Sequence, residues 1–267
     1  MKVVILAGGF GTRLAEETDI KPKPMVEIGG RPILWHIMMH YARFGFKNFV
    51  IALGYKGHVI KKYITDFCNI SSDLTVNLRS GKVWQDANYS MDWIVELVDT
   101  GYATETGGRL KRVAHRLPKD RPFLMTYGDG VSNVNLSDLL AFHTNHGKLA
   151  TLTAVRPPAR FGHLEFNGDL VSNFREKAQT DEGWINGGFF ICQPEVIDYI
   201  DSDDNKWERE PLERIAAEEQ LMAYKHDGFW QCMDALRDKM NLEKMWESGH
   251  APWKTWDVEE TRVNGRA

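Results

Sequence analysis

Two cations follow a glycine-rich segment near the start of the chain, and together they could hold phosphate groups. The segment LAGGFG runs over residues 6–11, and Arg13 and Lys23 come after it. Glycines have no side chain, so the backbone N–H groups of such a loop can close on an anion. The apolar run at residues 3–6 is typical of a buried strand. A strand, a phosphate-sized loop and two positive charges together indicate a site for a nucleoside triphosphate.

The two common glycine-loop motifs do not match this segment. A Walker A loop ends in Gly-Lys-Ser/Thr, whereas Gly11 is followed by Thr12 and Arg13. A dinucleotide-binding fingerprint needs a third glycine where Leu14 stands. The sequence therefore argues against a P-loop ATPase and a standard dehydrogenase. A glycine turn without a ligand is the alternative, and the two nearby cations weigh against it.

A pair of carboxylates could hold a divalent cation. Asp129 stands between two glycines directly after a predicted strand at 123–127, and Asp234 precedes a predicted helix at 235–247. Open α/β sheets bind ligands beyond the carboxyl ends of their strands, and Mg²⁺ usually takes one or two carboxylates plus phosphate and water. The alternatives are a turn-forming Asp129 and a helix-capping Asp234. The sequence leaves open whether the two side chains approach each other.

The histidines and cysteines give no comparable pattern. Two histidine pairs have helical spacing without a third ligand, and we expect no metal role for them: His36 with His40, and His143 with His146. The cysteines are three in number and have no paired spacing: Cys68, Cys192 and Cys232. This predicts reduced thiols in a cytoplasmic protein rather than a disulfide framework or a zinc site.

Composition sets further limits. The 267 residues are 43% hydrophobic and 26% charged, as in an ordinary globular protein. The net charge of −4 is mild and argues against a protein that binds nucleic acid mainly through phosphate contacts. No apolar stretch reaches the length of a membrane span, and the N-terminal apolar run is too short for a signal peptide. We expect a soluble protein acting on small molecules.

Apolar periodicity predicts strands that alternate with helices in the first half of the chain. The expected strands are 3–6, 49–53, 123–127 and 150–155, and the expected helices are 32–45, 57–67, 107–117 and 136–146. Residues 71–100 break this rhythm and suggest an inserted antiparallel element, with strands near 74–78 and at 93–98. In the second half we expect strands at 164–166, 170–174 and 188–192, a helix from 195, and helices at 210–219 and 235–247.

These elements predict an α/β fold: a Rossmann-like, mostly parallel sheet flanked by helices, with an inserted antiparallel element and a smaller C-terminal part. We expect a single domain over residues 1–256. Residues 257–267 form a polar tail for which we expect disorder.

Longer segments carry a specific resemblance. The chain resembles the sugar-nucleotidyltransferase (nucleotide-sugar pyrophosphorylase) family, and within it the glucose-1-phosphate cytidylyltransferases. The matching segments are LAGGFGTRL at 6–14, KPKPMVEIGGRPILWHIM at 21–38, LVDTGYATETGGRLKRVA at 97–114, TYGDGV at 126–131, RFGHLEF at 160–166, FREK at 174–177, INGGFF at 185–190, FWQCMDALRDK at 229–239 and APWKTW at 251–256. The first segment is typical of the whole superfamily, and the third is typical of the cytidylyl branch. The resemblance implies that the nucleotide side covers about 1–130 and that the smaller C-terminal part is sugar-binding, with the sugar-phosphate side covering about 131–256.

The resemblance implies a role for each candidate residue. The nucleotide would contact the loop Leu6, Ala7, Gly8, Gly9, Phe10, Gly11, Thr12 and Arg13, together with Lys23, Thr104, Arg109 and Gly128. Arg109 could donate to the O2 and N3 acceptors of cytosine. The sugar phosphate would contact Glu176, Lys177, Asn186 and Gly187, and Mg²⁺ would be held by Asp129 and Asp234. Surface positions for Arg109 and Lys177, and a type I′ turn at Asn186-Gly187, are the alternatives.

The implied reaction joins CTP and α-D-glucose 1-phosphate to give CDP-glucose and pyrophosphate. The ionised sugar phosphate would attack the α-phosphorus in line, with Arg13, Lys23 and Asp129 as catalytic residues. UTP, dTTP or another sugar 1-phosphate remains an alternative, as does a nucleotide-binding regulatory subunit without turnover. The family further suggests a homo-oligomer and a place in lipopolysaccharide O-antigen biosynthesis.

Overall fold

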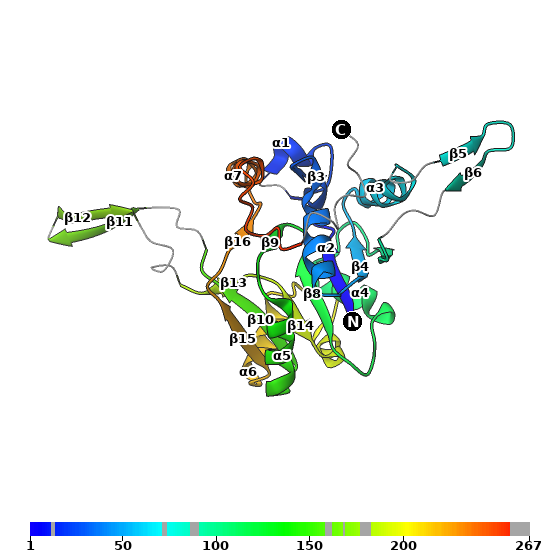
Figure 1. The fold of residues 1–267 in the computed structure, drawn as a ribbon. Helices are drawn as coiled ribbons and strands as arrows, with labels where there is room; N and C mark the ends of the chain where they lie inside the picture. The colour runs from blue at the N-terminus through cyan, green and yellow to red at the C-terminus, as the bar shows by residue number, and fades with distance from the viewer. Residues whose placement is uncertain are drawn as a thin grey trace.

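A mixed sheet forms the centre of the molecule, with helices on both faces (Figure 1). The structure is a computed structural model that describes residues 1–11, 14–70, 74–85, 91–157, 162–167, 169–176 and 183–256. Neighbouring strands follow the order β13-β10-β14-β8-β1-β4-β7, and β15 pairs with β10. Their bounds are β1 Lys2–Ala7, β4 Asn48–Leu53, β7 Ile94–Asp99, β8 Phe123–Tyr127, β10 Ala150–Val155, β13 Ile185–Asn186, β14 Phe190–Cys192 and β15 Leu221–His226.

The first four of these strands confirm the predicted fold class. β1 pairs in parallel with β4 on one side and with β8 on the other, and β4 pairs in parallel with β7. The chain therefore leaves β1 toward β4 and β7 and later returns to the opposite side of β1 at β8. Ligands of open α/β sheets bind at such a reversal, beyond the carboxyl ends of the strands.

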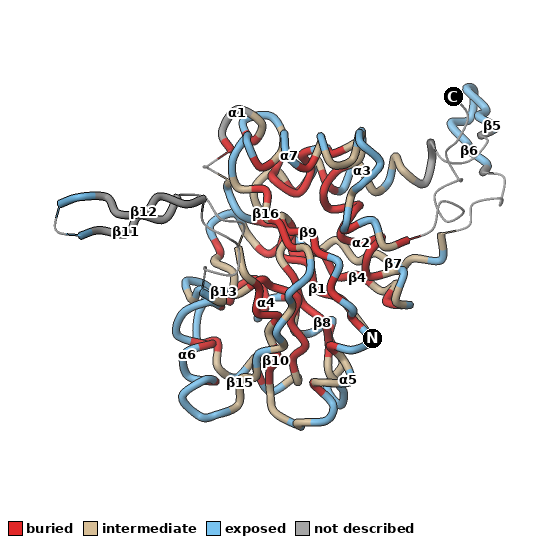
Figure 2. Tube along the Cα trace, turned by 60° about the vertical axis from the view of Figure 1, so that its left-hand side comes forward, coloured by how far each residue is buried: buried red, intermediate tan, exposed pale blue. Residues whose placement is uncertain are grey.

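The burial of strand β1 on both faces explains why its sequence is an unbroken apolar run. Val3 and Ile5 belong to the apolar cluster on one face of the sheet, and Val4 and Leu6 belong to the cluster on the other. Successive side chains of a strand point to opposite faces, so a strand covered on both faces has no polar side. Figure 2 shows the central strands as buried along most of their length.

The helices divide between these two clusters. α2 (Ile33–Arg43), α3 (Gly57–Ile70), α5 (Leu136–His146) and α7 (Leu236–Glu247) pack into the cluster that contains Val3. α4 (Thr106–Val113) and α6 (Glu210–Ala217) pack into the other. The short α1 is Ala15–Thr18, and the 3₁₀ helices are η2 Lys23–Met25, η3 Ala114–Arg116 and η5 Pro194–Tyr199. Gly45 follows α2 with a φ of +82°, the left-handed conformation that glycine adopts readily after a helix.

Two hairpins extend from opposite sides of the body in Figure 1. One pairs β5 (Leu74–Asn77) with β6 (Lys82–Gln85), and the other pairs β11 (Gly162–Asn167) with β12 (Leu170–Glu176). The prediction that residues 93–98 belong to the antiparallel insertion is wrong, because β7 joins the main sheet in parallel with β4. β7 is an edge strand with partly exposed residues, so its sequence lacks the fully apolar pattern of a central strand.

Several short elements differ from the sequence prediction. The helix expected from residue 195 is the 3₁₀ helix η5, which Pro194 starts. β15 was not predicted, since its sequence LMAYKH carries polar residues and its burial is only partial. Small antiparallel pairs also join β2 (Glu27–Ile28) to β3 (Arg31–Pro32), and β9 (Gly130–Ser132) to β16 (Trp230–Cys232).

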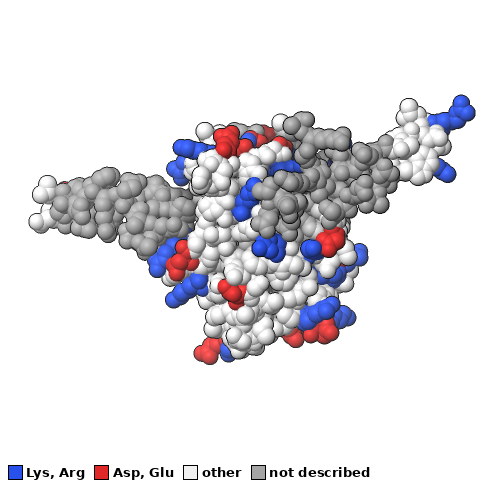
Figure 3. All heavy atoms as spheres, in the orientation of Figure 1, with Lys and Arg blue, Asp and Glu red and all other residues white. Residues whose placement is uncertain are grey.

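The surface agrees with the mild net charge. Basic and acidic side chains are interspersed on the face of the body shown in Figure 3. Within the described ranges, the helices are too short or too polar to cross a membrane. The polar tail at 257–267 lies outside these ranges.

Candidate active site

The glycine-rich segment lies where the central sheet reverses its strand order. It leaves the carboxyl end of β1 beside that of β8, and the Gly128 N–H donates to Leu6 O over 3.0 Å. On the other side, Tyr55 N donates to Gly8 O over 3.1 Å. Gly11 has a φ of +64°, a conformation that favours glycine. Thr12 and Arg13 lie outside the described residues.

A buried guanidinium explains why the segment needs a glycine at residue 8. A Cβ on Gly8 would lie 2.3 Å from Arg109 Cζ, and one on Gly54 would lie 2.2 Å from Arg109 Nη1. Arg109 is only 3% exposed, so the alternative that it is a surface cation is wrong. Burial lowers the pKa of Arg109, but a guanidinium remains charged at neutral pH.

Uncharged oxygens hold this guanidinium. Nη1 donates to Gly101 O over 2.7 Å and to Thr100 Oγ1 over 2.9 Å, and Nη2 donates to Gly8 O over 3.0 Å. Longer bonds reach Leu53 O and Tyr102 O. Arg109 therefore links the loops that follow β1, β4 and β7, and it places a positive charge in the wall they form.

A cavity of about 270 Å³ opens beside this segment. It is lined by Leu6, Ala7, Gly8, Gly9, Gly11, Lys23, Pro24, Thr104, Glu105, Thr106, Arg109, Tyr127, Gly128 and Asp129. We call it the nucleotide-side cavity. Gly128 leaves little room, because a Cβ there would come within 2.9 Å of Pro24 Cγ. Most residues predicted to contact the nucleotide thus share one wall, although Phe10 is absent from the lining and 43% exposed.

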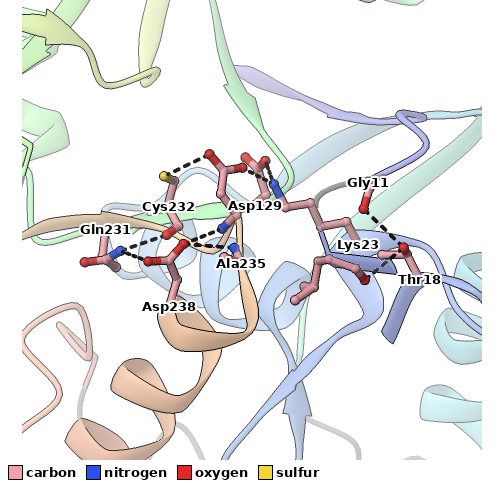
Figure 4. A network of polar contacts seen from close by, with 10 residues as sticks. Gly11, Thr18, Lys23, Asp129, Gln231, Cys232, Ala235 and Asp238 are labelled. Carbon is pink, nitrogen blue, oxygen red and sulfur yellow. Dashed lines mark hydrogen bonds and ion pairs between the residues drawn. The ribbon is translucent and has the colours of Figure 1, made fainter. Parts of the chain in front are cut away.

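Lys23 joins two carboxylates that are far apart in the sequence (Figure 4). Its Nζ lies 2.6 Å from Asp129 Oδ2 and 2.5 Å from Asp234 Oδ1. Burial by itself lowers the pKa of Lys23, but attraction by Asp129 and the hydrogen bonds to both carboxylates raise it above its ordinary value. The ammonium therefore stays charged, and the two aspartates face one cation.

Short backbone pairings bring these residues together. Asp129 lies in the turn between β8 and β9, and β9 pairs with β16, which leads to Asp234. Met233 N also donates to Asp129 O over 2.9 Å. Asp129 does lie in a turn, as its alternative held, but its side chain also bonds Lys23. The alternative for Asp234 is wrong, because Ala235 is the N-cap of α7.

A second cavity of about 280 Å³ meets the first at Asp129. We call it the sugar-side cavity, and it is lined by Thr126, Tyr127, Asp129, Gly130, Asn186, Gly187, Glu208, Trp230, Cys232 and Asp234. Asn186 belongs to β13 rather than to a type I′ turn, and its Oδ1 accepts the Gly188 N–H over 2.9 Å. Burial, followed by the nearby Glu208, raises the pKa of Tyr127 well above its ordinary value, so its hydroxyl stays protonated.

Only some of the remaining predicted residues fall within the described part of the chain. Glu176 ends strand β12, and Lys177 lies outside the described residues. The histidines have polar partners: His36 Nε2 is 2.8 Å from Ile28 O, and His143 Nδ1 is 2.8 Å from Thr151 Oγ1. Cys192 and Cys232 are free thiols, and burial raises the pKa of Cys232 to about 12.

Three residues near the site were missed by sequence reasoning. Thr18 is buried and donates to Gly11 O over 3.1 Å and to Leu14 O over 3.0 Å, on either side of residues 12 and 13. Glu208 lines the sugar-side cavity and accepts the Thr106 hydroxyl over 2.7 Å. Asp238 bonds the backbone at Asp234. An acidic residue in the first turn of a predicted helix was a signal for Asp238, whereas Thr18 and Glu208 gave none.

A family model described as nucleotidyl transferase matches residues 2–234. The chain belongs to this nucleotidyl transferase family. It is 54% identical to the glucose-1-phosphate cytidylyltransferase of Salmonella typhimurium over 96% of this chain and 100% of that protein. It is 31% identical to the catalytic subunit beta of mannose-1-phosphate guanylyltransferase from Dictyostelium discoideum, over 89% of this chain and 62% of that protein.

Solved structures show the same fold at lower sequence identity. A UDP-glucose pyrophosphorylase in complex with UDP-glucose superposes with a TM-score of 0.67 at 14% identity, covering 93% of this chain and 98% of that chain. The family match confirms the predicted resemblance. The shared fold agrees with the predicted α/β class.

Proposed function

We propose that this chain transfers a cytidylyl group from CTP to α-D-glucose 1-phosphate, giving CDP-glucose and pyrophosphate. The identity of 54% to a relative of that name, over nearly the whole of both chains, supports the choice of substrates. The observation that carries the chemistry is the contact of Lys23 with Asp129 and Asp234 where the two cavities meet. A nucleotide in one cavity and a sugar phosphate in the other would bring their phosphates together at this point.

The nucleotide would lie against the backbone of residues 6–11, with Thr104 and Gly128 beside it and Thr12 and Arg13 completing the loop. Arg109 gives this wall a positive charge whose bonding partners are uncharged oxygens. Protein oxygens already bond the Nη1 and Nη2 groups of Arg109, so its Nε–H is the donor that could reach an acceptor of cytosine, O2 or N3. Uracil presents a donor at N3 instead, so Arg109 and Thr104 are our candidates for the preference for cytosine.

The sugar phosphate would occupy the sugar-side cavity. Asn186 and Gly187 line it, and we propose that Glu176 and Lys177 complete it, with Lys177 on the phosphate. A phosphate monoester is already largely ionised at neutral pH, so its oxygen needs no general base before it attacks the α-phosphorus. Catalysis then consists of holding the two polyanions in line and offsetting their charge.

Asp129 and Asp234 suit a magnesium ion. Both present carboxylate oxygens to one cation, the ammonium of Lys23, and hard oxygen ligands of this kind are what Mg²⁺ prefers. Bound there, Mg²⁺ would neutralise phosphate charge as a Lewis acid. Lys23 and Arg13 would bind the triphosphate and the departing pyrophosphate.

Pyrophosphate release tests this proposal directly. CTP, UTP, dTTP and ATP are each supplied with glucose 1-phosphate, with Mg²⁺ or with a chelator. We expect Mg²⁺-dependent release with CTP and little with the others. Release with UTP or dTTP would reject the roles of Arg109 and Thr104 in base selection but keep the reaction. CTP binding without release, for a range of sugar 1-phosphates, would indicate a regulatory subunit instead.

The same proposal covers the location, domain organisation, oligomeric state and pathway of the protein. We place the protein in the cytoplasm, in agreement with its free thiols Cys192 and Cys232, and we expect it to act as one domain over 1–256. A homo-oligomer is favoured by the two extended hairpins, which expose Leu78, Val83, Trp84 and Leu170. CDP-glucose would supply deoxysugars for O-antigen biosynthesis.

A further inference from the structure

Asp238 is a buried carboxylate in the first turn of α7 (Figure 4). It holds the backbone that carries Asp234. Its side chain and backbone are together only 4% exposed. Oδ2 accepts the N–H of Asp234 over 3.0 Å and the N–H of Ala235 over 2.9 Å. Oδ1 is 3.4 Å from the donor Nε2 of Gln231. One carboxylate thus contacts three donors, all within the segment that ends in Asp234 and Ala235.

Asp238 makes one hydrogen bond more than helix capping requires. Ala235 is the N-cap of α7, and it has no side-chain oxygen with which to bond the first turn. In a capping box the residue three positions on satisfies the N–H of the N-cap, and Asp238 does so at Ala235. The additional bond to Asp234 lies outside the helix. It fixes the backbone of the residue whose carboxylate faces Asp129 across Lys23.

The choice of a charged residue also has a cost that a neutral cap would avoid. Asp238 adds a buried negative charge next to a segment that already carries Asp234, and burying a charge is unfavourable unless strong hydrogen bonds compensate it. Bonds from N–H groups to a carboxylate are stronger than those to a neutral acceptor. A stiff backbone and an additional negative charge would both favour a divalent cation at Asp234.

We propose that Asp238 is a positioning residue for the cation site, because it sets the backbone of Asp234 so that this carboxylate faces Asp129. The inference rests on the proposed function in taking these two aspartates as metal ligands. Asp238 itself touches neither substrate nor metal. It acts through Asp234, as the hydrogen-bond partners of metal ligands do elsewhere.

Mn²⁺ binding provides the test. Mn²⁺ is titrated into the full-length protein with an equimolar amount of CTP and no sugar phosphate, and free Mn²⁺ is followed by electron paramagnetic resonance. A titration of CTP without protein gives the Mn²⁺ that the nucleotide itself binds, and this is subtracted. We expect Asp238→Asn to weaken protein-bound Mn²⁺ by about tenfold or more, the range typical of residues that support metal ligands. The unfolding free energy of each variant is measured in parallel, without metal.

Asn135 offers a matched control for loss of a helix cap. Its Oδ1 accepts the N–H groups of Ser137 and Asp138 over 3.0 Å and 3.2 Å at the start of α5. Asn135→Ala should lower stability, as removal of a helix cap does, and leave Mn²⁺ affinity unchanged. Asp238→Ser keeps one capping oxygen and provides the measurement should the Asn variant fail to fold.

Each outcome decides the inference. Weaker Mn²⁺ binding in Asp238→Asn and in Asp129→Asn, with Asn135→Ala unchanged, supports it. An effect in Asp129→Asn alone overturns the role of Asp238 while the proposed function stands. Equal losses in Asp238→Asn and Asn135→Ala would mean a general effect of stability and overturn it as well. Unchanged binding in Asp129→Asn would overturn the metal pair and the role of Asp238 together.

Discussion

The two cavities that meet at Asp129 are built in different ways. The nucleotide-side cavity is lined largely by residues at the carboxyl ends of β1 and β8, among them Gly8, Gly9, Gly11 and Gly128, and by two buried cations, Lys23 and Arg109. The sugar-side cavity has two glycines, Gly130 and Gly187, and side chains such as Asn186 and Glu208. Both cavities border the central sheet, but the first is richer in glycine, where any substitution adds a side chain to the wall, whereas the second can change by exchange of side chains.

This difference has a consequence for the two substrates. Groups common to all nucleotides, namely ribose and phosphates, suit a wall of backbone N–H groups, while recognition of the base depends on few side chains. Changes in the nucleotide-side wall should cost folding stability as well as binding. Changes in the sugar-side wall should mostly alter the use of one substrate.

The largest effect is expected at Asp129, which belongs to both walls. Asp129→Ala should abolish Mg²⁺-dependent turnover, because it removes a proposed metal ligand and one of the two carboxylates at Lys23. Pyrophosphate release with Mg²⁺ and with chelator measures this. Asp120→Ala, an exposed position, is the control and should behave like the wild type. Turnover retained in Asp129→Ala would reject its metal role.

Lys23 should follow, as a cation of the nucleotide-side cavity that bonds Asp129 and Asp234 of the sugar-side cavity. Lys23→Ala is expected to lower turnover by ~10²-fold or more, the scale of losing one electrostatic contact to the transition state. Lys21→Ala removes a lysine two residues away whose partner Glu27 lies at the surface, 3.2 Å from it, and should have little effect. Steady-state kinetics with both substrates compares the variants. Near-normal turnover in Lys23→Ala would remove this residue from the mechanism.

A pair of adjacent glycines can sharpen the comparison on the nucleotide side. A Cβ at Gly8 would lie 2.3 Å from the Arg109 guanidinium, whereas a Cβ at Gly9 would meet nothing within 4 Å. Gly8→Ala should lower the unfolding free energy by about 1–3 kcal/mol, as overpacking does, and raise the KM for CTP. Gly9→Ala should leave stability nearly unchanged. Denaturant unfolding of both variants is the measurement, and equal stabilities would contradict a rigid backbone wall.

The sequence predicted the nucleotide-side wall better than the rest of the site. Its residues follow one strand in a continuous apolar-then-glycine pattern, so position in the chain largely determines position in space. The convergence of Asp129 and Asp234 on Lys23 was not predictable. It depends on the pairing of β9 with β16, two short strands about a hundred residues apart, and short strands have little periodicity.

Arg109 shows a second limit of the sequence. An arginine on a helix is usually exposed, and its burial depends on oxygens from separate loops that converge only in the folded sheet. The same holds for β7, whose position at the sheet edge makes a parallel strand resemble part of an insertion. The roles of Arg13 and Lys177 stay predictions, since both lie outside the described residues.

The smallest effect is expected from substitution of Asn186. This variant tests whether each cavity affects the KM of its own substrate alone. Asn186→Ala removes a side chain from the sugar-side cavity together with its bond to Gly188 N. Loss of one hydrogen bond to a sugar hydroxyl should raise the KM for glucose 1-phosphate by roughly tenfold and leave the KM for CTP unchanged. Asn77→Ala is a matched control, because Asn77 Oδ1 likewise accepts an N–H two residues on, from Arg79 over 3.0 Å, in a distant hairpin. Equal increases in both KM values would show that Asn186 supports the cation site between the cavities rather than the sugar alone, and the separation of the walls would have to be abandoned.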